Sequence, residues 1–232
     1  MTQKKRSGLR VCTTVVRAGL KSNDDRIAAA KGLISARPND SELVVLPAGF
    51  LEARSEAQVR EVAAPVIDAA RAANVAVILG VDAAGRGSAK KGSLPYFLVG
   101  WSPGLRRAAV WRQRSETSAD ARDAPPAALA EARALRVAGR SVAPIACGEV
   151  FSPAVRERVA EMKPHVAVLA AHSARGARHW AGQRCLAKLG VRSVRAVHAS
   201  GEARDFLCTA ARERPPDVAF ELAGMIASCF EV

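Results

Sequence analysis

The chain has 232 residues, of which 49% are hydrophobic and 25% charged. This length and composition are typical of one globular domain with a full apolar core, and they exclude a disordered chain. The net charge of +13 is compatible with nucleic acid, but the arginines are scattered along the chain and only 4% of residues are aromatic, which argues against a nucleic-acid-binding surface.

Strands and helices alternate in the first half of the chain. Short, continuous apolar runs predict strands that are covered on both faces, at residues 9–16, 43–46 and 75–81. Apolar residues at helical spacing predict helices at residues 24–36 and 55–74. The second helix starts with a capping-box pattern, Ser55 and Gln58, and contains Pro65, which predicts a kink.

A hairpin and two loops complete this half. Residues 94–101 and 105–112 flank a Ser-Pro-Gly turn, which predicts an antiparallel hairpin and therefore a mixed sheet. Polar segments that contain glycine or proline predict loops, at residues 83–92 and 115–130.

The same alternation continues past the midpoint. Strands are predicted at residues 142–146, 166–171 and 191–198. One helix begins after Ser152, a capping residue followed by Pro153, and another covers residues 178–189 and ends at Gly190. No domain-sized linker interrupts the pattern, which predicts one layered α/β domain over residues 1–232.

Cys147 is the residue with the clearest chemical potential. It follows the predicted strand 142–146 and precedes a helix, the place where side chains emerge at the carboxyl edge of an α/β sheet. A thiol is a strong nucleophile once a neighbouring base or positive charge raises its thiolate fraction. The alternative interpretation is a buried, inert core cysteine.

The other cysteines and the apolar runs bear on location. The five cysteines are widely spaced and include no Cys-x-x-Cys pair, which argues against a disulfide framework or a zinc ribbon. We therefore expect a reducing compartment, with four small apolar core residues at Cys12, Cys185, Cys208 and Cys229. No apolar run approaches the ~20 residues that cross a bilayer, and the basic start of the chain leads into a strand-like segment. These features predict a cytoplasmic protein that spans no membrane.

Several short motifs, taken in order, resemble the nitrilase (carbon–nitrogen hydrolase) superfamily over nearly the whole chain. They are ELVVLP at 42–47, VAVILG at 75–80, WRQ at 111–113, the strand and elbow at 142–149, FSP at 151–153 with Arg156, and Trp180 with RCLA at 184–187. The resemblance implies a four-layer α-β-β-α sandwich with two mixed sheets face to face, and a homodimer. A glutamine-amidotransferase-like sandwich is the competing fold, and it predicts a histidine that pairs with Cys147.

The resemblance also implies a reaction and a ligand. In this superfamily a glutamate acts as general base, a lysine stabilises the oxyanion, and a cysteine, here Cys147, attacks the carbonyl or nitrile carbon to form an acyl intermediate. The ligand implied is a small amide or nitrile, with no cofactor and no metal.

This sequence departs from that pattern at two positions. Ala48 stands where the glutamate should follow Leu46-Pro47, and Gln113 stands where the lysine should follow Trp111-Arg112. Alanine accepts no proton and glutamine carries no charge. Because loss of one oxyanion donor alone costs on the order of 100-fold to 1,000-fold in rate, the two changes favour a degenerate site without standard amidase or nitrilase activity.

Other residues are candidates to replace the missing groups. Glu52 could act as base if residues 48–50 bend back, Arg112 could clamp an anion, and Glu149 lies two residues from Cys147. His172 ends the predicted strand 166–171 and could form a Cys-His pair with Cys147. Further candidates are Arg114, Asp120, Asp123 and His198. For the charged residues the alternative is a solvated surface or a helix cap.

Three functions remain open from the sequence. The first is a degenerate homologue that binds or scaffolds, and the second is an active thiol hydrolase that uses Cys147 with relocated partners. The third is a basic nucleic-acid-binding protein. The spacing of His172 and His179 does not fit a metal site, and the glycines at 80, 85 and 87 do not fit a dinucleotide fingerprint.

Overall fold

The structure is a computed structural model that describes residues 8–17, 19–83, 96–114, 133–172, 177–198 and 207–232. The predicted loops at residues 83–92 and 115–130, with Asp120 and Asp123, lie outside these residues except for Ala83, which ends a strand. No helix in the described ranges is long and apolar enough to cross a membrane.

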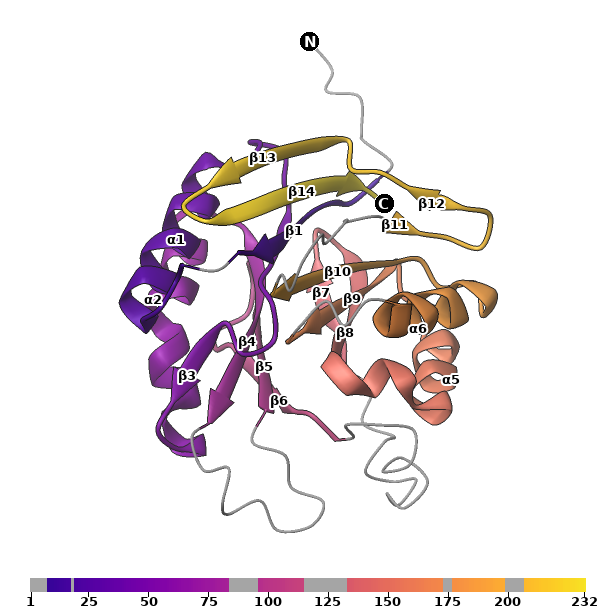
Figure 1. The fold of residues 1–232 in the computed structure, drawn as a ribbon, viewed down its shortest axis with the longest axis horizontal. Helices are drawn as coiled ribbons and strands as arrows, with labels where there is room; N and C mark the ends of the chain where they lie inside the picture. Colours follow the sequence, from indigo (N-terminus) through magenta and orange to yellow (C-terminus); the bar gives the residue numbers. More distant parts are fainter. Residues whose placement is uncertain (1–7, 18, 84–95, 115–132, 173–176, 199–206) are drawn as a thin grey trace.

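One curled sheet of 14 strands forms the centre of the protein (Figure 1). One half contains β2 (Leu43–Val45), β3 (Leu51–Ala53), β4 (Ala76–Ala83), β5 (Tyr96–Trp101) and β6 (Ala109–Arg112). The other half contains β7 (Leu135–Val137), β8 (Arg140–Ala146), β9 (Val166–Ala171) and β10 (Ser193–His198). The remaining strands are β1 (Arg10–Val16), β11 (Leu207–Cys208), β12 (Glu213–Arg214), β13 (Val218–Leu222) and β14 (Met225–Glu231).

Strand β1 joins the two halves. It pairs in parallel with β2 near its start and with β10 at its end, and it pairs antiparallel with β14 along its whole length. The neighbour order is β6-β5-β4-β2-β1-β10-β9-β8-β7. The mixed α/β fold predicted from the sequence is confirmed. Two separate sheets are not found, because β1 makes the hydrogen bonding continuous.

Helices cover the outer faces of both halves. Helices α1 (Asn23–Ala36) and α2 (Val59–Ala72) lie outside the β4–β5 half, and α5 (Pro153–Glu161) and α6 (Ala177–Lys188) lie outside the β8–β9 half (Figure 1). The Ser152 hydroxyl accepts from the Val155 N–H at 3.4 Å, which confirms the predicted cap. The predicted capping box at Ser55 is wrong, since the chain first forms a 3-10 turn, η1 (Glu56–Gln58), and Ser55 makes no side-chain cap.

Three large apolar clusters of described residues follow from this arrangement. One lies between the halves and includes Ile78, Val168 and Phe230, each fully buried. The other two lie beneath the helix pairs, one under α1 and α2 and one under α5 and α6. Strands that are buried on both faces read as continuous apolar runs, which is why the sequence located them correctly.

Cys12 and Cys229 form a disulfide, which corrects their expected role as free core residues. They are directly opposed in the antiparallel β1–β14 pair, with a Cα–Cα distance of 4.1 Å. The two residues are 217 positions apart, so cysteine spacing carried no signal of the pairing. Disulfides persist in oxidising environments, and the bond therefore removes the argument for a reducing compartment that rested on cysteine spacing.

Candidate active site

The candidate site residues gather at one edge of the sheet. Strands β4, β2, β1, β10, β9 and β8 are parallel neighbours, so their carboxyl ends meet at the same edge. Cys147 follows β8, His172 follows β9, and His198 ends β10. Ala48 follows β2, and Asp82 is the penultimate residue of β4. Side chains at this edge of an open α/β sheet are the ones that meet ligands.

Cys147 occupies a sharp turn from strand to helix. It begins the 3-10 turn η2 (Cys147–Phe151) directly after β8, and its φ of 28° is rare for a residue with a side chain. Its thiol is partly exposed, and it packs on a small apolar cluster that includes Ala48 and Ala170. The thiol is therefore not sealed in the core, and the position expected for the family's glutamate lies beside it.

His172 connects Cys147 to a carboxylate. Its Nε2 atom lies 2.9 and 3.0 Å from the two carboxylate oxygens of Asp82, and its imidazole is close enough to the Cys147 thiol to lower the pKa of that thiol. The Tyr96 ring meets the imidazole edge-on, with 4.7 Å between the ring centroids. Since Asp82 occupies Nε2, Nδ1 is the ring nitrogen left to exchange a proton with the thiol.

Opposing effects set the pKa values of this pair. Burial raises the pKa of Cys147, but hydrogen bonds from His172 and His179 and the charge of His172 outweigh burial and lower the pKa from 9.0 to about 6. Burial lowers the pKa of His172, but hydrogen bonds and charge from Asp82 and Cys147 raise it to about 10. At neutral pH the pair is therefore a thiolate beside an imidazolium.

Two more histidines border the site. His179, on α6, places Nε2 3.8 Å from the Cys147 sulfur, and its ring lies 5.2 Å from that of Phe151. Its Nδ1 atom is buried and has no hydrogen-bond partner within the described part of the chain. His198 Nε2 donates to the Ala48 carbonyl at 3.0 Å, and burial lowers its pKa. The site thus contains one imidazole with a raised pKa, His172, and one with a lowered pKa, His198.

Two glycines allow the close packing of this site. A Cβ atom at Gly49, whose φ is 63°, would lie 2.8 Å from Asp82 Oδ2 and 2.9 Å from His172 Cδ2. A Cβ atom at Gly80 would lie 2.3 Å from the Ala48 Cα. The segment that carries Ala48 can approach β4 and the Asp82–His172 pair only because both side chains are absent.

Glu149 lies near the thiol in sequence but is committed to structural contacts. Its carboxylate accepts from the backbone N–H groups of Ala146 at 3.0 Å and Arg114 at 2.7 Å. It also forms a two-pronged ion pair with Arg133, at 2.6 and 2.8 Å, in which both side chains are buried. These contacts hold the Cys147 turn against the chain that follows β6.

Glu52 and Arg112 are not brought to the thiol. The Glu52 side chain is 70% exposed and pairs with Arg26 at 3.2 Å. Arg112 forms an ion pair with Glu56, and its guanidinium lies 4.9 Å from the centre of the Phe97 ring. The bend that would return the Glu52 carboxylate to the site is absent, because residues 51–53 form a short strand beside β4.

The two substituted positions are both buried. Ala48 is 3% exposed, and Gln113 is also 3% exposed, with its backbone N–H donating to the Tyr96 carbonyl at 2.8 Å. Neither supplies a proton acceptor or a positive charge of the kind that the superfamily's glutamate and lysine supply. Among the described residues, no group of three or more His, Cys, Asp and Glu side chains could hold a metal ion.

Asp82 and the thiol contact of His179 are the features that sequence reasoning missed. An acidic residue at the end of an otherwise apolar strand, as Asp82 is, was an available signal of function. His179 was considered only as a metal ligand, and no spacing rule relates a helix residue to a cysteine 32 positions earlier.

Comparison with known proteins supports the fold. No protein-family model and no curated protein matches the sequence. A cysteine-to-alanine mutant of the Nesterenkonia AN1 amidase from the nitrilase superfamily superposes with a TM-score of 0.69 and 12% identity, over 98% of this chain and 92% of that one. The fold is therefore that of the nitrilase-superfamily amidases, as the sequence resemblance predicted.

Other structures of the same enzyme agree. The amidase from Nesterenkonia sp. gives a TM-score of 0.66 at 14% identity, over 97% of this chain and 92% of that one. A mutant of that amidase, with acrylamide joined by Michael addition to its active-site cysteine, gives 0.65 at 12% identity, over 95% and 92%. At such low identity the superposition establishes the fold alone. The chemistry must be argued from the residues of this chain.

Proposed function

We propose that the protein is an active thiol hydrolase of carbon–nitrogen bonds in small amides or nitriles. Cys147 is the nucleophile, His172 is the general acid and base, and Asp82 orients His172. The observation that carries this proposal is the Asp82–His172 pair at the carboxyl edge of the sheet, beside Cys147, whose pKa the His172 imidazole lowers. It supplies a proton acceptor that Ala48 cannot supply.

For an amide, the proposed reaction has two halves. The Cys147 thiolate attacks the carbonyl carbon, and the carbonyl π electrons move to oxygen. When the tetrahedral intermediate collapses, the C–N bond breaks and the leaving amine takes the proton of the His172 imidazolium. A water molecule then gives its proton to His172 as its oxygen attacks the thioester, which releases the acid and returns the Cys147 thiolate and the imidazolium.

In this scheme the oxyanion is stabilised by a neutral hydrogen-bond donor. Gln113 stands where the superfamily's lysine would be and can donate a hydrogen bond without charge. The lower electrostatic stabilisation predicts a slower enzyme than the lysine-containing relatives, by up to about 100-fold to 1,000-fold.

The test is hydrolysis of a panel of short aliphatic and aryl amides and nitriles, measured as ammonia release. Cys147→Ala should abolish turnover, and His172→Gln should lower kcat by at least about 100-fold. His165→Gln is the matched control, because the His165 side chain bonds to the Val232 carbonyl at 2.9 Å and the residue lies before β9, at the other edge of the sheet. Turnover that survives Cys147→Ala would refute the proposal.

A second candidate is a degenerate homologue that binds small amides without hydrolysing them. Ala48 and Gln113 favour it, because both of the superfamily's charged partners of the cysteine are absent. This candidate predicts measurable amide binding that is unchanged by Cys147→Ala, together with no ammonia release and no acyl adduct on Cys147 by mass spectrometry.

Three further properties are proposals, the dimer from the resemblance and the other two from the sequence pattern. We propose that residues 1–232 act as one domain, that the protein forms a homodimer, and that it resides in the cytoplasm. Light scattering on the purified chain tests the dimer. Alkylation of the thiols in intact cells tests the location, because the Cys12–Cys229 disulfide should be reduced in the cytoplasm and intact in an oxidising compartment.

A further inference from the structure

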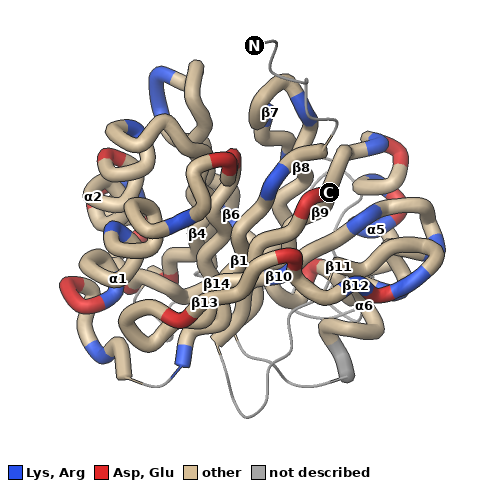
Figure 2. The backbone as a smooth tube through the Cα atoms, turned by 90° about the horizontal axis from the view of Figure 1, so that it is seen from above, with Lys and Arg blue, Asp and Glu red and all other residues tan. Residues whose placement is uncertain are grey.

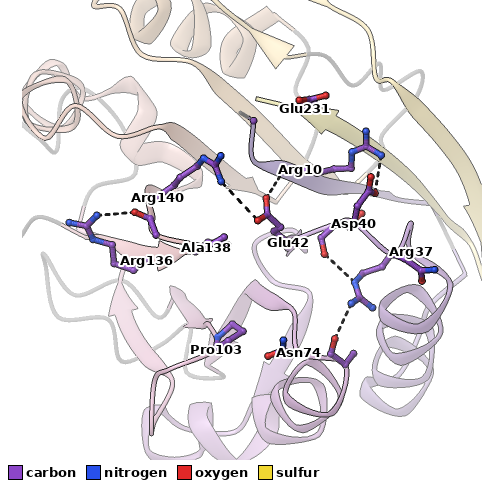
Figure 3. A pocket seen from close by; sticks show the side chains of 16 residues that line it. Arg10, Arg37, Asp40, Glu42, Asn74, Pro103, Arg136, Ala138, Arg140 and Glu231 are labelled. Atoms are coloured by element: carbon purple, nitrogen blue, oxygen red, sulfur yellow. Dashed lines mark hydrogen bonds and ion pairs between the residues drawn. The ribbon is translucent and has the colours of Figure 1, made fainter. Parts of the chain in front are cut away.

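A large polar cavity lies at the edge of the sheet opposite to Cys147. It has a volume of about 1320 Å³ and is lined by residues at the amino ends of β1, β2, β4 and β8, among them Arg10, Glu42, Asn74 and Arg140 (Figure 3). A second cavity of about 480 Å³ shares Arg136 and Arg140 with the first. The two cavities together are called the groove below. Because the seven residues of β8 separate its start at the groove from Cys147, the groove lies roughly 20 Å from Cys147.

Most charges on one side of the groove are already balanced. Arg10 pairs with Asp40 at 2.9 Å, and its backbone N–H donates to Glu42 at 3.2 Å. Arg37 donates to backbone carbonyls, including that of Ala73 at 3.0 Å. Figure 3 shows Arg10, Asp40 and Arg37 on one side of the cavity and Arg136 and Arg140 on the other. Glu42 lies between the two sides and also pairs with Arg140 at 4.0 Å, so the acidic residues balance the Arg10 side and Arg140.

The other side carries positive charge that is not balanced. Arg136, Lys163 and Arg192 line the smaller cavity, and none of them forms an ion pair within the described residues. They come from three separate segments: Arg136 from the β7–β8 hairpin, Lys163 from the turn before β9, and Arg192 from the turn before β10. No carboxylate is among the described residues that line the smaller cavity. Figure 2 shows basic residues on this side of the molecule, around β7 and β8.

We propose that this groove is a second site, which binds an oligophosphate such as a di- or triphosphate chain. Convergent arginines suit phosphate oxygens, because the guanidinium donates two parallel hydrogen bonds. Three unbalanced cations match the charge of an oligophosphate better than the roughly −1.5 to −2 of a single phosphate group. The cations lie along a groove rather than around one point, which also suits a chain of linked phosphates.

The lining argues against single-stranded nucleic acid as the ligand. Sequence-independent binding of single strands combines a basic groove with aromatic rings on which bases stack. No Phe, Tyr or Trp side chain is among the described residues that line either cavity. The groove thus offers contacts to phosphate and none to a base.

The test is isothermal titration of the full chain with sodium tripolyphosphate, pyrophosphate and orthophosphate at near-physiological salt. A double variant, Arg136→Gln with Arg192→Gln, removes two of the unbalanced charges. The matched control is Arg54→Gln with Arg212→Gln, which removes the same charge from two exposed residues that line neither cavity. A second site variant, Lys163→Gln, keeps the test valid if the double variant is unstable.

The expected result is that tripolyphosphate binds at least about tenfold more tightly than orthophosphate, and that the double variant weakens tripolyphosphate at least about tenfold. The control should change affinity by less than about twofold, as expected for screened distant charges. Equal weakening by both double variants would show bulk charge and overturn the proposal, as would tighter binding of a ten-residue oligothymidylate than of tripolyphosphate. The readout is binding, so the result is independent of hydrolysis at Cys147.

Discussion

Replacement of His172 by glutamine tests whether this histidine sets the ionisation of Cys147. The variant loses the imidazolium beside the thiol, while burial, which raises the pKa, and the His179 contact, which lowers it, both remain. The pKa of Cys147 should therefore rise from about 6 to near or above its ordinary value of 9.0. At pH 7 the thiolate fraction would fall from about 90% to about 1%.

The rate of alkylation at a single pH understates this change. A thiolate of higher pKa is intrinsically more nucleophilic, and a pKa higher by about three makes each thiolate about twentyfold more reactive. The higher reactivity of each thiolate offsets much of the lower thiolate fraction. At pH 7 iodoacetamide should therefore label the variant only about fourfold to fivefold more slowly than the wild type. The midpoint of the pH profile is the decisive quantity.

The assay is iodoacetamide labelling between pH 4.5 and 10, with modification of Cys147 quantified by peptide mass spectrometry. Cys185, which is free and partly exposed, is the internal reference. The wild type should show a midpoint at about 6, and His172→Gln should move it up by about three pH units. His165→Gln should leave it unchanged. A wild-type midpoint near 9, or the same midpoint in His172→Gln and wild type, would refute the reasoning.

Three further changes test the frame around the thiol. Glu149→Gln leaves the buried Arg133 without its carboxylate, and urea unfolding should show a loss of about 3 kcal/mol; no loss would mean that the pair does not hold the turn. Gly49→Ala should push Asp82 and His172 apart and raise the alkylation midpoint of Cys147, and an unchanged midpoint would contradict the packing argument. Cys229→Ala should cost about 2–5 kcal/mol in urea under oxidising conditions, and the difference from wild type should disappear in dithiothreitol.

The secondary structure predicted from the sequence is correct where the local pattern and the tertiary environment agree. Residues 75–81 read as a buried strand because both faces of β4 are covered, and the apolar run records this directly. The β5–β6 hairpin follows from its turn residues. The predicted box at Ser55 failed because the chain forms a 3-10 turn before α2 begins at Val59.

The site was predicted less completely than the fold. Cys147 could be located from the sequence, because a strand that runs into a helix exposes its last side chain at the sheet edge. His172 was one candidate partner of Cys147, because it follows a neighbouring strand at the same sheet edge. Glu52 and Glu149 were plausible by proximity in sequence, but strand pairing turns the first toward solvent and Arg133 engages the second.

The sequence by itself determined the α/β class, most of the alternating strands and helices up to residue 198, the turn that carries Cys147, and the alanine and glutamine at positions 48 and 113. These features are local, because they depend on the period of apolar residues and on single motifs. Only the tertiary structure decided that Asp82 lies against His172, that Cys12 lies against Cys229, and that three cations meet at the amino edge. Such contacts depend on which strands become neighbours, and residues 90 or 217 positions apart carry no mutual signal in one sequence.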